Sequence, residues 1–273
     1  MRAFARLQTI CRDATTSSNG VDGTSIFTGR KTVSVKLNRR DLIVSGAAVA
    51  GALSIGASAA GAAEPAHGKP TEMTPDQALA RLIKGNRDFV TDRPNSSDLS
   101  IRRRLALAKG QTPFAALVGC ADSRVGPEHL FGAGLGELFI VRTAGNYVDS
   151  AGLGSLAYAV AALSVPLIVV LGHERCGAVD AALSVVQNNT QFPPSLTRML
   201  EPILPSIISA KAAAAPGANL LDACIASNVR RVVAGLRQSS DPILAGPIAA
   251  KRVRVVGARY DLDTGEVDFF DLA

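Results

Sequence analysis

The sequence is poor in residues that form disulfides. It has 4 cysteines among 273 residues, with 3 histidines and no tryptophan. Cys11 precedes a segment that we expect to be removed, so the mature chain would keep Cys120, Cys176 and Cys224. An odd number of cysteines argues against a framework of disulfides, even in an oxidising compartment. Thiolates held by a metal ion would be protected from such oxidation.

Acidic residues are scarce near the N-terminus, and this scarcity accounts for most of the net charge of +6. Of the 29 basic and 23 acidic residues, 8 and 3 lie in residues 1–62, which leaves 21 and 20 for the remainder. A strongly basic domain would suggest nucleic acid or a membrane surface as a partner. Because the remainder is nearly balanced, we expect no nucleic-acid partner.

Residues 1–62 have the features of a targeting segment. Arg39 and Arg40 precede an apolar stretch rich in Ala and Gly, which ends in small residues at 60–62. The pattern resembles a twin-arginine export signal, which carries folded proteins with their cofactors in place. We therefore expect a protein that is exported, periplasmic or extracellular. An uncleaved membrane anchor is the alternative, and only in that case would the protein associate with a membrane.

Residues 63–273 are expected to form a single α/β domain with a mostly parallel central sheet and flanking helices. Nearly continuous apolar runs at 114–119, 137–143 and 166–171 predict strands covered on both faces. A helical pattern at 150–165 lies between the second and third strands and predicts a parallel crossover. Further helices are predicted at 74–90, 101–110, 176–187, 193–215 (broken by Pro202 and Pro205) and 219–237, and residues 253–271 predict a strand running into a hairpin around Asp263-Thr264-Gly265.

Two of these strands end in residues that bind metals. The first delivers Cys120, and the third delivers His173 and Cys176. Because ligands gather at the carboxyl ends of parallel strands, we expect these three side chains to meet. Two sulfurs and one imidazole form a typical zinc set, and three protein ligands leave a fourth position open, as a catalytic site requires.

Asp122 and Arg124 follow Cys120 at alternate positions. In an extended segment such residues point the same way, which would place Asp122 beside the metal and Arg124 beside Asp122. The arginine would keep the acid ionised, so that Asp122 could accept a hydrogen bond from a hydroxide on the metal. Taken singly, a buried cysteine is more often a packed thiol, and an Asp-x-Arg pair is more often a surface ion pair. The joint pattern favours a catalytic site.

CADSR at 120–124 and GHERCGAV at 172–179 resemble the motifs of the β-class carbonic anhydrases, and the likeness extends over most of residues 74–271. The resemblance implies reversible hydration of carbon dioxide to bicarbonate, with one zinc ion per chain held by Cys120, His173 and Cys176. It implies a catalytic dyad of Asp122 and Arg124. It also implies a homodimer or a dimer of dimers, with an apolar pocket lined across the dimer interface. The substrate-binding residues that it implies are Gln111, Gly177, Phe139, Ala144 and Tyr158.

Two positions differ from residues found in that family, one in a usual motif and one at a position that varies among its members. The usual Arg-Asn-x-x-Asn is here Arg142-Thr143-Ala144-Gly145-Asn146, with threonine at the second position. Leu117 stands where some members have a tryptophan that belongs to a bicarbonate-regulated closed state, so we expect that regulation to be absent or altered. Two rival functions remain open. One is hydrolysis of carbon disulfide or carbonyl sulfide by the same ligands, and the other is a zinc-holding module without turnover.

Overall fold

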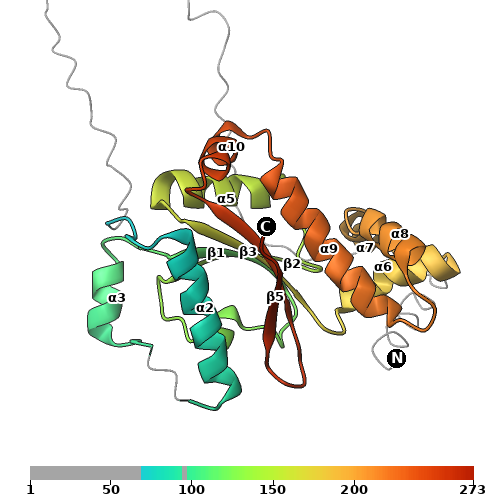
Figure 1. Ribbon diagram of the computed structural model, residues 1–273, viewed down its shortest axis with the longest axis horizontal. Helices are drawn as coiled ribbons and strands as arrows, with labels where there is room; N and C mark the ends of the chain where they lie inside the picture. The colour runs from blue at the N-terminus through green and yellow to red at the C-terminus, as the bar shows by residue number, and fades with distance from the viewer. Residues whose placement is uncertain (1–68, 94–96) are drawn as a thin grey trace, which may run out of the picture. The chain divides into compact units, whose positions relative to one another are not determined.

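The sheet that carries the site has the strand order β2-β1-β3-β4-β5 in the computed structural model, which describes residues 69–93 and 97–273 (Figure 1). Strands β1, β2, β3 and β4 run parallel, and β5 pairs antiparallel with β4 through a hairpin. The predicted α/β fold with a mostly parallel sheet is therefore confirmed. The strands are β1 (Ala115–Cys120), β2 (Leu138–Thr143), β3 (Leu167–His173), β4 (Arg254–Tyr260) and β5 (Val267–Asp271).

The two central strands of the site are buried along their whole length. Every residue of β1 and of β3 is buried, as their uninterrupted apolar sequences predict. The run at 137–143 also predicted a strand covered on both faces, but this was wrong: β2 lies at the edge of the sheet, and within the chain most of its residues are only half-buried. The ladder between β1 and β3 pairs Gly119 with Leu171, so these two strands end side by side.

Helices cover both faces of the sheet (Figure 1). Side chains of one face, such as Val118 and Val170, pack with α5, α9 and α10. Side chains of the other face, such as Leu117 and Val169, pack with α2 and α4. The helices are α2 (Pro75–Val90), α3 (Ile101–Leu107), α4 (Pro127–Leu130), α5 (Ser150–Leu163), α6 (Gly177–Asn188), α7 (Pro194–Leu200), α8 (Leu204–Ala213), α9 (Leu220–Arg237) and α10 (Pro242–Ala249).

Helix α2 begins as its sequence predicts. The Thr74 hydroxyl accepts from the Gln77 backbone amide, and the Gln77 side chain accepts from the Thr74 amide, which completes a capping box. The apolar residues along this helix are only partly covered within the chain. Leu79 and Leu82 are buried, whereas Ile83 and Phe89 are 40% and 36% exposed.

Proline positions account for the differences from the predicted helices. We expected Pro205 to break a helix, but it lies in the first turn of α8, where its missing N–H costs nothing. Helix α10 was not predicted, and it contains Pro247. An internal proline argues against a helix. Because α10 has only 8 residues, Pro247 removes one hydrogen bond from a short element, and the start of the helix is capped by Asp241, which accepts from the Ile243 backbone amide.

Residues 1–62, which we expect to be a signal segment, lie outside the described part of the chain. Among the residues that the structure does describe, no helix combines the length and the apolar character that crossing a membrane requires.

Candidate metal centre and active site

The carboxyl ends of β1 and β3 bring together three side chains of types that can bind a metal ion, which we call the metal cluster. Cys120 is the last residue of β1, His173 is the last residue of β3, and Cys176 is the N-cap of α6. Their ligand atoms all lie within 4.8 Å of one another, and all three residues are buried. The two sulfurs are 3.9 Å apart and both cysteines are free, so they form no disulfide.

The ring of His173 is oriented by the backbone. Its Nδ1 lies 2.9 Å from the carbonyl oxygen of Glu174, and donation to that oxygen places the proton on Nδ1. Nε2 then faces the sulfurs with a free lone pair. This nitrogen is buried without a hydrogen-bond partner in the described part of the chain. Buried polar atoms are rarely left unpaired, so the donor set of two thiols and this nitrogen fits a zinc ion.

Backbone amides surround the two sulfurs. The Gly145 amide donates to Cys120 Sγ at 3.3 Å, and Cys176, as the N-cap of α6, lies beside the backbone amides of the first turn of that helix. The pKa of the Cys120 thiol lies well below its usual range, because Cys176 donates to its sulfur and because His173 and the Gly145 amide lie against it. One sulfur of the pair is therefore disposed to be a thiolate, the form that binds metals.

Asp122 lies beside this cluster and is held by Arg124. Arg124 Nε is 2.9 Å from Asp122 Oδ1, Nη2 is 2.7 Å from Oδ2, and the Arg124 amide also donates to Oδ1. These hydrogen bonds from Arg124 lower the pKa of Asp122 to about 2, against the opposing effect of burial. Asp122 Oδ2 is 3.8 Å from His173 Nε2, so an ionised carboxylate faces the position that a bound ion would occupy.

Arg142 holds the backbone of the loop that carries this aspartate. Its Nε donates to the carbonyl oxygen of Cys120, and its Nη2 donates to the carbonyl oxygens of Asp122 and Val125, each at 2.8 Å. Sequence reasoning noted Arg142 as part of a motif but gave it no role. Its position in the edge strand β2, directly opposite Gly119, is the signal that could have indicated one.

Comparison with known proteins identifies the family of the chain. A family model described as carbonic anhydrase matches residues 115–267, more than half of the sequence. Carbonic anhydrase 2 of Mycobacterium tuberculosis is 42% identical over 191 residues, which span 70% of this chain and 90% of that protein. The carbonic anhydrase of Mycolicibacterium smegmatis is 43% identical over 195 residues, 71% of this chain and 92% of that one.

The chain belongs to the carbonic anhydrase family. Among solved structures it is similar to two tetrameric beta-carbonic anhydrases from Sordaria macrospora, with a TM-score of 0.55 and 26% identity over 61% of this chain and 85% of that one. Both the β class and the fold are thereby shown. The reaction of the family is the reversible hydration of carbon dioxide to bicarbonate, and this chain is a carbonic anhydrase in that sense.

The expected substrate residues of this carbonic anhydrase fall into two groups. Ala144 directly follows β2, whose last residue Thr143 pairs with Cys120, and Gly177 directly follows Cys176 as the first residue of α6. These two lie next to the metal cluster. The other three, which we call the distal group, do not: Gln111, Phe139 and Tyr158.

The distal group lies toward the opposite end of β1. Gln111 precedes that strand, whose six residues span about 16 Å at 3.3 Å per residue, so it is remote from Cys120 of the same chain. Phe139 pairs with Ala116, four positions before Cys120, and its ring centroid is 6.2 Å from that of Tyr158. One chain alone therefore does not bring the distal group to its own metal cluster, and the roles of these residues stay predictions.

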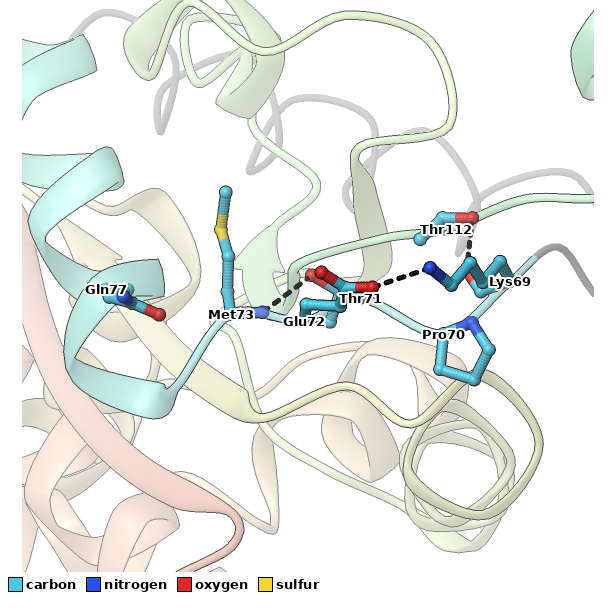
Figure 2. Close-up of a pocket in the computed structure, with 7 residues that line it drawn as sticks. All are labelled: Lys69, Pro70, Thr71, Glu72, Met73, Gln77 and Thr112. Carbon is cyan, nitrogen blue, oxygen red and sulfur yellow. Dashed lines mark hydrogen bonds and ion pairs between the residues drawn. The ribbon is translucent and has the colours of Figure 1, made fainter.

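A hollow at the start of the described chain is also remote from the carbonic anhydrase site. Figure 2 shows it lined by residues 69–73 with Gln77 and Thr112. The Thr112 hydroxyl donates to the carbonyl oxygen of Lys69 at 2.8 Å, and Lys69 pairs with Glu72 at 2.6 Å. Thr112 precedes β1, whereas Cys120 ends it, so this hollow lies away from the metal cluster.

Proposed function

We propose that one zinc ion per chain binds to Cys120, His173 and Cys176 and supports carbon dioxide hydration there. The observation that carries the proposal is the unpartnered, fully buried Nε2 of His173, turned toward two free sulfurs. Zinc bound at such a set acts as a Lewis acid and lowers the pKa of a water molecule. Two thiolates offset the charge of the ion, so we expect activity to rise at alkaline pH.

The residues beside the metal cluster would position the reacting water and the product. Asp122 is ionised at neutral pH and can only accept hydrogen bonds, so it would orient a water or hydroxide by accepting a hydrogen bond from it. Arg124 prevents Asp122 from turning, because it binds both carboxylate oxygens. The backbone amide of Gly177, exposed at the N-terminus of the 12-residue helix α6, is suited to an anionic product such as bicarbonate.

Metal analysis and hydration kinetics on the full chain test this proposal. We expect equimolar zinc and rapid hydration in a stopped-flow indicator assay at pH 8.5. In the Asp122→Asn variant we expect the zinc content to persist and the rate to fall. Zinc-replete protein with no rate above that of buffer would refute the proposal.

We propose further that the distal group acts on the metal cluster of a second copy of the chain. Gln111 would then donate to the substrate oxygen, and Phe139 and Tyr158 would line the carbon dioxide pocket with Ala144 of the other chain. The half-buried apolar edge strand β2 and the tetrameric state of the Sordaria macrospora enzymes support a dimer or a dimer of dimers. Light scattering at micromolar concentration tests the assembly, and a monomer with full activity would refute it.

We also propose that residues 1–62 export the protein to the periplasm or the cell exterior. The paired Arg39 and Arg40 before an Ala-rich and Gly-rich stretch support this. Cell fractionation of wild type and of the double variant Arg39→Lys and Arg40→Lys tests it. We expect the variant to stay in the cytoplasm with residues 1–62 attached, and equal export of both proteins would refute the twin-arginine route.

A further inference from the structure

A buried polar side chain, Asn228 of α9, lies directly behind the metal cluster. It is 1% exposed and shares the buried side of its helix with Cys224, Ile225 and Val229. Its Nδ2 donates to the carbonyl oxygen of Gly145 at 2.8 Å. Its Oδ1 accepts from the hydroxyl of Ser206 in α8 at 3.3 Å. Both ends of the amide are therefore paired away from water, which fixes the orientation of the side chain.

Gly145 connects this amide to a metal-binding sulfur. Its carbonyl oxygen accepts from Asn228, while its own N–H donates to Cys120 Sγ at 3.3 Å. The residue has φ +87°, a conformation that glycine adopts without strain. An added Cβ would lie 2.5 Å from Ile203 Cδ1 and 3.3 Å from Ala178 Cβ. The backbone at Gly145 is thus confined between the sulfur and α9.

The rest of the turn has its own hydrogen bonds. The Thr143 hydroxyl donates to the carbonyl oxygen of Tyr147 at 2.8 Å, and the backbone N–H of Asn146 donates to the carbonyl oxygen of Thr143 at 3.2 Å. These bonds close the turn, but neither involves Gly145. Ile203 and Ala178 pack beside Gly145, and among the described residues the side-chain hydrogen bond that connects Gly145 to the helical layer is the one from Asn228.

We infer that Asn228 is a positioning residue, which holds the Gly145 amide in hydrogen-bonding contact with the Cys120 sulfur. A hydrogen bond to a thiolate withdraws electron density from sulfur, so the sulfur donates less to the metal ion and the ion stays more electrophilic. Outer-shell partners of this kind tune metal affinity and reactivity without touching the ion. The inference rests on the proposed metal site and adds to it a buried chain of contacts from Ser206 through Asn228 and Gly145 to Cys120.

The variant Asn228→Leu tests the inference, because leucine has a similar volume and makes neither hydrogen bond. In cobalt-substituted enzyme we expect the thiolate-to-cobalt charge-transfer band to move to longer wavelength. We expect zinc affinity, measured by competition with a chelator, to change by about 10-fold. The matched control is Ser227→Ala, the adjacent residue, whose hydroxyl donates to the carbonyl oxygen of Ser206 at 2.9 Å and makes no contact with Gly145. The control should keep the wild-type band and affinity.

A folded Asn228→Leu protein with the wild-type cobalt band and zinc affinity would overturn the inference. If this variant does not fold, Ser206→Ala decides, because it removes the hydrogen bond that Asn228 Oδ1 accepts and leaves the side chain held by its bond to Gly145 alone. A smaller band shift in the same direction is expected there, and an unchanged spectrum would overturn the inference. A wild-type chain that takes up neither zinc nor cobalt would refute the metal site itself, and this inference with it.

Discussion

Arg124 holds Asp122 by both carboxylate oxygens, with its Nε 2.9 Å from Oδ1 and its Nη2 2.7 Å from Oδ2. The pair leaves Asp122 ionised and fixes the direction of its remaining lone pairs next to the metal cluster. Replacing Asp122 by asparagine keeps the shape but turns one oxygen into a donor. We expect the turnover number for carbon dioxide hydration to fall by about 100-fold or more, measured by stopped flow. Zinc content should stay at the wild-type level, and an unchanged turnover number would remove Asp122 from the mechanism.

Removal of a ligand cysteine should destabilise the protein through loss of the metal, whereas removal of the third buried cysteine should not. Cys176 belongs to the cluster and Cys224 does not, although both are buried and free. A ligand that binds only the folded state stabilises it by about 4 kcal/mol when its free concentration is a thousand times Kd. We expect Cys176→Ala to abolish the gain in melting temperature that added zinc gives apo-protein, and Cys224→Ala to keep it. Equal responses of the two variants would contradict the assignment of ligands.

Mixed dimers should reveal whether Gln111 acts on the other chain. Asp122→Asn and Gln111→Leu each impair every site of their own homodimer. In a heterodimer of the two, one site would combine an intact Asp122 with the partner's intact Gln111. Random reassociation of equal amounts should therefore restore about a quarter of wild-type activity, because half of the dimers are mixed and each has one complete site. If the activity of the mixture equals the mean of the two variants measured separately, Gln111 does not act on the site of the other chain.

The carboxylate of Glu137, at the start of β2, should make stability depend on pH. Burial raises its pKa, but a hydrogen bond from the Gly134 amide at 2.8 Å and the ion pair with Arg81 at 2.7 Å outweigh that effect, so the pKa lies below its usual value of 4.5. A pKa depressed by folding gives stability that is present above the unfolded value and lost as pH falls through the folded value. We expect Glu137→Gln to reduce the free energy of unfolding more at pH 7 than at pH 3, measured by urea denaturation. Equal losses at both pH values would contradict this.

The sequence predicted the location of the metal cluster because strand ends are local features. Two apolar runs that end in Cys120 and His173 are enough to place those residues at one edge of a parallel sheet. The pairing of Asp122 with Arg124 was likewise predictable, because the two residues are only two positions apart in the chain. Periodicity also gave the boundaries of α2 and α9 closely, because capping and apolar spacing agree there.

The distant contacts were not predictable from these patterns. Asn228 lies on the apolar face of α9 and bonds to Gly145, a residue 83 positions earlier in the chain. A polar residue on an apolar helix face is a warning of such a contact, but it does not name the partner. Gln111 lies far from Cys120 of the same chain because the two residues are at opposite ends of β1. A motif match gives the residue types but not these positions in space. Helix α10 was not predicted, and its 8 residues with an internal Pro247 give only a weak helical signal.

The ladder between β1 and β3 has a consequence for the order of assembly. Cys120 and His173 lie at the ends of two adjacent buried strands, so the backbone hydrogen bonds of the sheet fix their separation, and Cys176 follows when α6 docks. The coordination geometry is thus a product of sheet formation. A chain of this design can complete its folding before it encounters an ion, and the preformed geometry then selects which ion is retained.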